Sequence, residues 1–324
     1  MALEFEKPII EIQQKITELQ KLSDKHVDFL PEIKKLEQKL AEIKLKVYDK
    51  LSAWQRIQIA RHPKRPYTLD YIQMMMTDFI ELHGDRLFAD DMAIVGGLAK
   101  IDDQPVVVLG HQKGRDTSEN IKRNFGCAHP EGYRKAMRLM RMAERFDLPI
   151  VIFIDTPGAF PGIGAEERGQ AQAIAENLRD MAQIRTPIIA TVIGEGGSGG
   201  ALGVGVADHV IILQNSYYSV ISPEGCASIL WRSATKASEA AEALKLTGEY
   251  LIKFGIVEEI IPEPLGGAHY APIEVAATLK ASILKQINRL KALSLDELVE
   301  ARYKKFRKVG QFTVASAVGA AIEK

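Results

Sequence analysis

Apolar residues in the first sixty positions recur at steps of three and four, which is the spacing of one helix face. A first series is followed by a break over residues 23–29 and then by a longer second series. Their members are Ile9, Ile12, Ile16 and Leu19, and then Leu30, Ile33, Leu36, Leu40, Ile43 and Val47. Each stripe is narrow, so the pattern predicts two helices packed as an antiparallel hairpin. The hairpin either lies on its own domain or forms an arm that contacts another subunit, and the pattern leaves both open.

Beyond a basic, proline-punctuated connector at residues 61–70, the pattern is helical over residues 71–82 and then changes. From about residue 93 to 261, short apolar runs typical of buried strands alternate with amphipathic stretches typical of helices. The expected strands are 94–100, 105–109, 148–154, 187–193, 208–213, 217–221 and 257–261. The expected helices are 130–146, 165–183, 199–206, 237–246, 272–292 and 295–307.

This order of elements predicts an α/β fold with mainly parallel strands, because strand–helix–strand connections wind in one sense. It also predicts two parts. The first is an N-terminal helical hairpin or arm at residues 1–60. The second is a main domain at residues 61–324, which includes the C-terminal helices.

One glycine-dense segment follows the expected strand 187–193. It reads IGEGGSGGALGVG over residues 193–205, with five glycines between positions 194 and 200. Glycine loses more conformational entropy on folding than other residues, so the cluster indicates positive φ angles or a close approach of two backbones. A glycine segment that opens a helix also presents free backbone N–H groups, which bind an anion or stabilise one that develops during a reaction. The alternative is tight packing between strand and helix without chemistry.

The segment lacks the signatures of nucleotide-binding loops. No Lys-Ser or Lys-Thr pair follows the glycines, as a P-loop requires. The spacing GxGxxG is met by Gly194, Gly196 and Gly199, but Glu195 inside the loop would repel a pyrophosphate. We therefore favour an anion site or an oxyanion hole.

A second glycine-containing segment, DTPGAFPGIG, follows the expected strand 148–154 and contains Gly158, Ala159 and Phe160. Ligands in α/β folds collect at the carboxyl ends of strands. Because parallel strands wound in one sense end at the same edge, we expect both glycine segments to open onto one face.

A third segment, GHQKGR, places Lys113 and Arg115 directly after the expected strand 105–109. Two basic side chains on glycine-flanked backbone suit phosphate binding. An ordinary solvated loop explains them as well.

Composition argues against several classes of function. The 324 residues carry a formal net charge of +0, so nothing favours nucleic acid or a membrane surface. The only cysteines, Cys127 and Cys226, lie far apart, which argues against a disulfide framework or a Cys-rich zinc site in this chain. The N-terminus lacks a signal-peptide pattern, and no apolar run reaches the ~18–20 residues that span a bilayer. We expect a cytoplasmic protein.

Side chains typical of catalysis are few. There is no GxSxG elbow and no HExxH motif, and Ser198 lies between glycines with no histidine nearby in sequence. Glu166 and Glu167 lie in the first turn of an expected helix, where negative charge complements the helix dipole, and Glu224 begins another helical stretch. Backbone donors remain, and they suit a reaction that stabilises an enolate, with thioester enolates as the obvious class.

Five motifs together carry a family resemblance: RHPKRPYTLDY, GHQKGRDT, DTPGAFPGIGAEERGQ, VIGEGGSGGALGVG and SVISPEGCASILW. With them, the chain resembles the alpha subunits of bacterial acetyl-CoA carboxylase carboxyltransferases over nearly its whole length, as far as IPEPLGGAH. The resemblance implies a crotonase/ClpP-type spiral of repeated ββα units. The motifs say nothing of the tail after about residue 309.

The resemblance also implies an activity and partners. The activity is transfer of a carboxyl group from carboxybiotin, held on biotin carboxyl carrier protein, to acetyl-CoA, giving malonyl-CoA for fatty acid synthesis. The partners are a zinc-bearing beta subunit in an α2β2 assembly, with the active site between α and β, and biotin carboxylase. No metal is expected in this chain. Two oxyanions develop, on the biotin ureido group and on the thioester enolate, so two oxyanion holes are needed, and the alpha-side hole serves the biotin oxygen.

The residues that the resemblance assigns fall into two sets. The expected catalytic set consists of the donors Gly199 and Gly200, with Gly196 and Gly197 shaping the segment. The expected substrate-binding set consists of Gly158, Ala159, Phe160, Lys113 and Arg115.

Two other functions remain open. A stand-alone crotonase-type acyl-CoA hydratase or decarboxylase would need a placed carboxylate, with Glu166, Glu167 and Glu224 as candidates. A non-catalytic assembly subunit would use the glycines only for packing.

Overall fold

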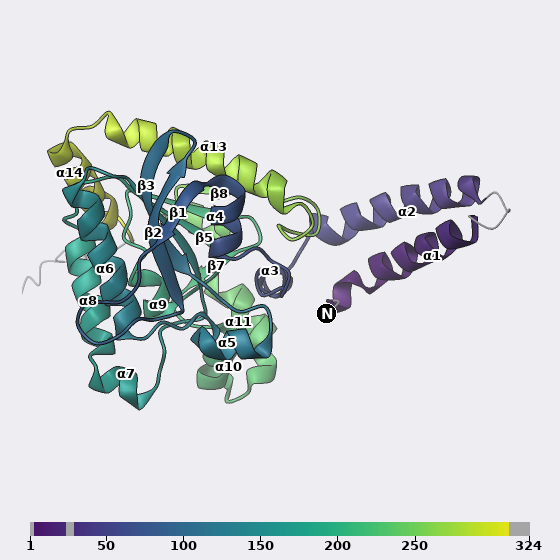
Figure 1. Cartoon of the computed structure of the whole chain (residues 1–324). Helices are drawn as coiled ribbons and strands as arrows, with labels where there is room; N and C mark the ends of the chain where they lie inside the picture. The colour runs from purple at the N-terminus through teal and green to yellow at the C-terminus, as the bar shows by residue number, and fades with distance from the viewer. Residues whose placement is uncertain (1–2, 24–28, 311–324) are drawn as a thin grey trace, which may run out of the picture.

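The computed structural model describes residues 3–23 and 29–310, so the expected break between the first two helices and the C-terminal tail lie mostly outside the described residues. In the described chain, one mixed sheet lies between helices (Figure 1). Its strands are β1 Thr77–Glu81, β2 Ile94–Ile101, β3 Gln104–His111, β4 Ile150–Thr156, β5 Ile188–Gly197, β6 His209–Leu213, β7 Tyr217–Ser219 and β8 Glu259–Ile261.

The strand order is β1-β2-β3-β4-β5-β6-β8, and β7 pairs with the end of β5. The pairs β1–β2 and β2–β3 are antiparallel, whereas the strands from β3 onward pair in parallel. Every residue of β4 and of β5 is buried, as expected for central parallel strands that helices cover on both faces. The predicted α/β architecture with mainly parallel strands is therefore confirmed.

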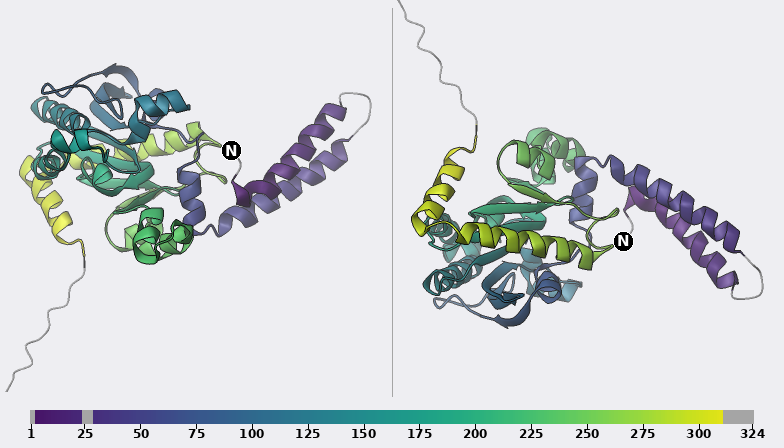
Figure 2. Two further views of the ribbon diagram at one scale, coloured as in Figure 1. Left: turned by 90° about the horizontal axis from the view of Figure 1, so that it is seen from below. Right: turned by 90° about the horizontal axis from the view of Figure 1, so that it is seen from above.

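Helices cover the two faces of the sheet (Figures 1 and 2). On one face, α6 Pro130–Arg145 and α8 Gln170–Met181 pack with the sheet around Leu139, Ile152 and Ala190. On the other face, α4 Thr68–Met75 and α13 Pro272–Lys291 pack around Tyr71, Phe153 and Ile283. The remaining helices of the body are α5 Thr117–Lys122, α7 Ile163–Glu167, α9 Ser198–Leu202, α10 Pro223–Trp231, α11 Ala237–Leu244, α12 Gly248–Lys253 and α14 Leu295–Arg307.

The N-terminal helices form the predicted hairpin. Helices α1 Lys7–Ser23 and α2 Leu30–Asp49 pack on each other through Ile12, Ile16 and Ile33, and the pair extends away from the body (Figures 1 and 2). The hairpin therefore does not lie on its own domain. Its contact with another subunit stays a prediction, as does the division at residues 1–60 and 61–324.

A further helix, α3 Ala53–Ala60, joins the hairpin to the body. It belongs to the predicted 1–60 segment, yet its buried Ile57 packs in one cluster with Tyr217 and Leu246 of the body. Its first turn has a capping box, because Ser52 accepts from the amide of Gln55 and the Gln55 side chain accepts from the amide of Ser52.

Two expected helices are wrong in part. The predicted helix over residues 71–82 ends at Met75, and β1 follows because this segment pairs with the edge of β2. The predicted helix over residues 165–183 is divided into α7 and α8 at Gly169, whose φ of 82° lies in the left-handed region. Both differences arise from local or cross-strand contacts that helical periodicity does not report.

The largest difference from the expected strand boundaries lies at β5. The expected strand ends at residue 193, but β5 continues through the glycines to Gly197 and passes directly into α9. The extension is held on both sides, since Gly196 is paired with Thr156 of β4 and with Tyr218 of β7. Much of the predicted glycine turn is therefore strand.

No helix within residues 3–23 and 29–310 is long and apolar enough to cross a lipid bilayer.

Candidate functional site

The two glycine segments meet at the carboxyl ends of β4 and β5, on one face of the body as predicted. A methyl group at Gly197 would lie 2.2 Å from the carbonyl oxygen of Pro157, and one at Gly200 would lie 2.4 Å from the amide nitrogen of Ala159. Glycine is needed at both positions because the two backbones touch there.

Close approach, and not positive φ, explains the glycines of the first segment. The left-handed residue at the β5–α9 junction is Ser198, with a φ of 53°. In the second segment, Gly158 has a φ of 156°. A non-glycine residue in the left-handed region costs of order 1–3 kcal/mol, so the surrounding structure must hold Ser198 in place.

Some amides of the two segments are already engaged within the protein. The Gly158 amide donates to Thr156 Oγ1 at 3.1 Å, and the Phe160 amide donates to the Ala128 carbonyl at 3.0 Å. Within the described chain, the amides of Ala159, Gly199 and Gly200 have no protein acceptor. The same holds for the amides of Ser198 and Ala201, so the candidate donors where the segments meet are the amides of Ala159 and of residues 198–201.

Two cavities adjoin this region. Ser198 and Gly199 line both of them, whereas Gly200 is buried and lines neither. The loop cavity, of about 830 Å³, is lined by Pro157, Gly158, Ala159, Phe160, Pro161, Glu166, Gly169, Gln170, Ala171, Gln172, Ile174, Ser198 and Gly199. Phe160 is held in its wall by stacking on His129, with ring centroids 4.2 Å apart.

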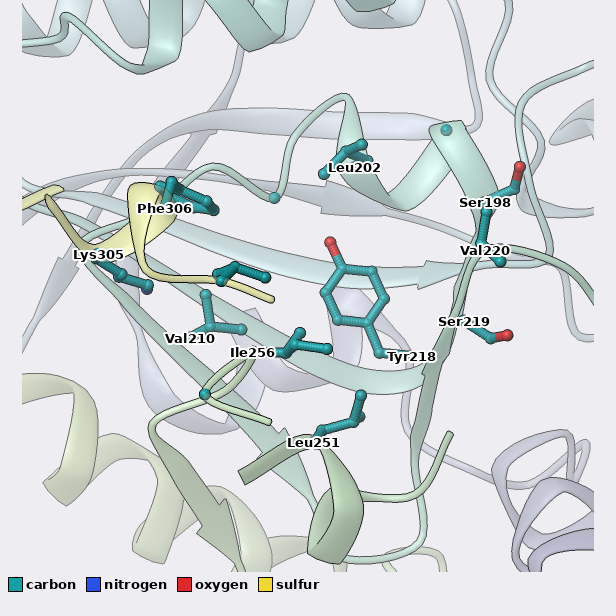
Figure 3. Close-up of a pocket in the computed structure, with 14 residues that line it drawn as sticks. Ser198, Leu202, Val210, Tyr218, Ser219, Val220, Leu251, Ile256, Lys305 and Phe306 are labelled. Carbon is teal, nitrogen blue, oxygen red and sulfur yellow. The ribbon is translucent and has the colours of Figure 1, made fainter. Parts of the chain in front are cut away.

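The second, apolar cavity has a volume of about 540 Å³ (Figure 3). It is lined by Ser198, Gly199, Leu202, Gly205, Val210, Tyr218, Ser219, Val220, Leu251, Gly255, Ile256, Lys305, Phe306 and Val309. Figure 3 shows the Tyr218 hydroxyl group directed toward Leu202 across this space, and burial raises the pKa of Tyr218 to about 12. The cavity thus offers apolar walls and a neutral phenol beside the glycine segment.

Beneath the two segments lies a buried charged cluster formed by Arg61, Lys113, Asp155, Glu195 and Tyr217. Lys113 Nζ contacts Asp155 Oδ1 at 2.7 Å and Glu195 Oε1 at 2.8 Å. Glu195 Oε2 accepts from Arg61 Nε at 2.7 Å and from the Tyr217 hydroxyl at 2.6 Å.

The cluster is electrostatically matched. Burial acts to raise the pKa of Glu195, but the charges of Lys113 and Arg61 outweigh it and hold that pKa at about 2. Burial acts to lower the pKa of Lys113, and Asp155 and Glu195 raise it above its usual range. Burial and the neighbouring Glu195 carboxylate raise the pKa of Tyr217. Glu195 is thus a carboxylate, Lys113 an ammonium ion and Tyr217 a phenol at neutral pH.

The predicted phosphate ligands Lys113 and Arg115 lie apart from both cavities and are engaged within the protein. Arg115 pairs with Asp70, donates to the carbonyl of Arg65 and stacks on Tyr67, with its guanidinium carbon 4.0 Å from the ring centroid. The Lys113 side chain is 12% exposed.

Of the candidate carboxylates, Glu166 lines the loop cavity, whereas Glu224 pairs with Arg61. Sequence reasoning did not assign Arg61, Asp155 and Tyr217 to the site. For Asp155 a signal exists in the sequence, because it is a single acid placed directly after the apolar run IVIFI. No group of three or more His, Cys, Asp or Glu side chains among the described residues is arranged to hold a metal ion.

Comparison with known proteins identifies relatives over nearly the whole chain. Residues 2–310 match the family model described as acetyl co-enzyme A carboxylase carboxyltransferase-like. A protein of Geobacter metallireducens is 57% identical over 310 residues, which are 96% of this chain and 98% of the relative. A protein of Thioalkalivibrio sulfidiphilus is 58% identical over 311 residues, with the same shares. Both are named acetyl-coenzyme A carboxylase carboxyl transferase subunit alpha.

Solved structures share the fold at low sequence identity. A chain of a Pseudomonas malonate decarboxylase hetero-tetramer in complex with coenzyme A has a TM-score of 0.59 and 17% identity, covering 72% of this chain and 91% of that one. Transcarboxylase 12S has a TM-score of 0.55 and 18% identity, covering 82% of this chain and 46% of that one. These neighbours confirm the predicted crotonase-like fold.

Proposed function

The chain belongs to the acetyl co-enzyme A carboxylase carboxyltransferase-like family, and from this premise we propose that it is the alpha subunit of an acetyl-CoA carboxylase carboxyltransferase. The observation that carries the proposal is the identity of 57–58% to named alpha subunits across nearly the full length of both chains. The transferase acts within a multi-subunit complex. Its partners are a zinc-bearing beta subunit in an α2β2 assembly, biotin carboxyl carrier protein and biotin carboxylase, in the cytoplasm.

The reaction moves a carboxyl group from biotin on its carrier protein to acetyl-CoA, which yields malonyl-CoA. When bound, carboxybiotin supplies the carboxyl group. The free amides at the glycine segments suit the ureido oxygen, because negative charge develops on it and they have no competing protein acceptor.

The catalytic part of this chain is then a set of main-chain donors. Gly199 and Gly200 donate to the developing anion. Gly197 lets β5 pass close to the end of β4, and Gly196 lets it pass close to Tyr217 and Tyr218 of β7. Ala159 belongs to the substrate-binding set with Gly158 and Phe160, and its free amide lies beside Gly200. The thioester enolate is served by the second hole, on the beta subunit.

A mixing assay tests the function. The purified chain, its beta subunit, malonyl-CoA and biocytin, a soluble biotin derivative, are combined, and acetyl-CoA formation is followed. We expect turnover with both subunits present and none with this chain alone. Full-rate turnover by the isolated chain would exclude a subunit role.

One observation favours a second candidate, an acyl-CoA hydratase, because the Glu166 carboxylate lines the loop cavity. Hydration of crotonyl-CoA by the purified chain, lost in a Glu166→Gln variant, would support that alternative. Absence of hydration together with turnover in the mixing assay would remove it.

A further inference from the structure

Lys113 touches the strand ends from which both glycine segments start. Strands β3, β4 and β5 are parallel neighbours, and Lys113, Asp155 and Glu195 lie at their carboxyl ends. The ammonium group of Lys113 bridges the two carboxylates. It is the one cation in the described chain that contacts both.

Backbone contacts also support the bridge that Lys113 makes between Asp155 and Glu195. Asp155 Oδ1 also accepts from the amide of Glu195 at 2.9 Å. A methyl group at Gly194 would lie 2.5 Å from this same oxygen, and one at Gly126 would lie 2.9 Å from Lys113 Cγ. The glycines at these positions leave room for the Asp155 carboxylate and for the Lys113 side chain.

The two carboxylates lie at the same distance in sequence from free donors. Asp155 precedes Ala159 by four residues, and Glu195 precedes Gly199 by four residues. A change in the separation of the two carboxylates therefore changes the separation of the two donor-bearing segments. Their contact is already tight at Gly200, so a shift of a few tenths of an ångström alters it.

We propose that Lys113 is a positioning residue of the carboxyltransferase site, holding the carboxyl ends of β4 and β5 together so that the amides of Ala159, Gly199 and Gly200 converge. The inference rests on the proposed function and deepens it. It gives Lys113 a task other than binding phosphate, in keeping with its two buried partners and its absence from both cavity walls.

The test uses the complex with the beta subunit and measures kcat and KM for malonyl-CoA in the reverse reaction. For Lys113→Met we expect kcat to fall at least 10-fold, with KM changed by less than about 3-fold, because geometry at the reacting centre is lost and CoA contacts are not. Lys113→Arg keeps the charge and should restore part of kcat. A rise in KM with unchanged kcat would overturn the proposal, since it would indicate a phosphate contact.

Lys135→Met is the matched control. Lys135 is also a buried ammonium, paired with Asp90 at 2.6 Å and bonded to the carbonyl of Asp91, but it lines neither cavity. We expect this variant to lose stability while its kcat stays near that of the wild type. An equal loss of kcat in both variants would mean that any lost buried ion pair has this effect, and the proposal would fail.

A second measurement does not depend on catalytic activity. Amide hydrogen exchange should accelerate in Lys113→Met at residues 157–160 and 196–202 and remain unchanged in the arm. If Lys113→Met does not assemble, the charge-balanced variant Lys113→Met/Glu195→Gln takes its place, with the same expectations. Wild-type exchange in these segments, or failure of Lys113→Arg to assemble, would overturn the proposal. An inactive wild-type complex would instead count against the proposed function.

Discussion

Gly199 and Gly200 are adjacent in the chain but have different surroundings. A methyl group at Gly199 would have Ile174 Cδ1 as its nearest contact, at 3.9 Å, whereas one at Gly200 would collide with Ala159. Replacement at Gly200 therefore disturbs packing and chemistry together. Gly199 is the position at which a side chain fits without disturbing the contact between the two segments.

We predict that Gly199→Pro lowers kcat by at least about 10²-fold. Proline lacks the N–H donor, whose loss alone has an effect of this size, and it also restricts the left-handed Ser198 that precedes it. Gly199→Ala keeps the donor and fits the available space, so its kcat should stay within a few-fold of the wild type. Both are measured in assembled complexes with the beta subunit. Equal kcat values for the two variants would mean that this amide does no chemistry and would favour a purely structural role for the glycines.

A pH prediction follows from Glu195. Its pKa of about 2 in the folded chain lies below the ordinary value of ~4.3, so its contribution to stability is present above about pH 4.3 and is lost as pH falls toward 2. Glu195→Gln should therefore be less stable than the wild type at pH 7, and the difference should shrink between pH 4.3 and 2. The measurement is the unfolding midpoint against pH. A difference that is constant across this range would contradict the assignment.

At the scale of elements, a buried arginine of α14 makes many of the contacts between that helix and the body. Arg302 is fully buried, pairs with Asp208, and donates to the carbonyls of Met181, Ile184 and Thr186. The last turn of α14 contributes Lys305 and Phe306 to the apolar cavity. Fixing this helix thus shapes the space beside Gly199.

We predict that Arg302→Met lowers the free energy of unfolding by ~3–5 kcal/mol, because it leaves Asp208 buried without its charge partner. Lys304→Met on the same helix is the control, since Lys304 is 64% exposed and pairs with Glu300 on the surface. Its effect should stay within ~0.5 kcal/mol. Chemical denaturation of both variants checks this, and comparable losses would refute the role given to Arg302.

At the scale of the whole molecule, the arm and the body are held by separate apolar clusters. The hairpin cluster contains Ile12, Ile16 and Ile33, whereas α3 shares a cluster with Tyr217 of the body. Helix α3, which lies within the predicted 1–60 segment, therefore packs with the body. The wider division of the chain stays a prediction.

Two truncations test this boundary. Removal of residues 1–50 should change the stability of the body by no more than ~0.5 kcal/mol, because few contacts cross to it. Removal of residues 1–60 also takes away Ile57 and should cost more than the ~2–5 kcal/mol typical of one buried aliphatic side chain. Thermal and chemical unfolding of the two shortened chains gives the comparison. Equal stability of both would place the boundary after α3.

Much of the fold was predictable from sequence where the signal is local. The apolar steps of the hairpin, the runs at β4 and β5 and the amphipathic α6 each report their own burial, and all form as expected. The end of β5 was not predictable, because glycines carry no apolar signal and the extension depends on pairing with β7, which lies beyond the next strand in sequence. The same holds for β1, which forms a strand because it pairs with β2.

By itself, the sequence determined the family, the order of the strands from β2 to β8 and the two glycine segments, since each of these depends on contiguous residues. Only the tertiary structure decided which amides are free, because Thr156 and Ala128 occupy those of Gly158 and Phe160. It also decided that Lys113 lies between Asp155 and Glu195. The hydrogen bonds and ion pairs of Lys113 join residues at the ends of β3, β4 and β5. Which atoms pair depends on their distance in space, and the order of residues along the chain does not give that distance.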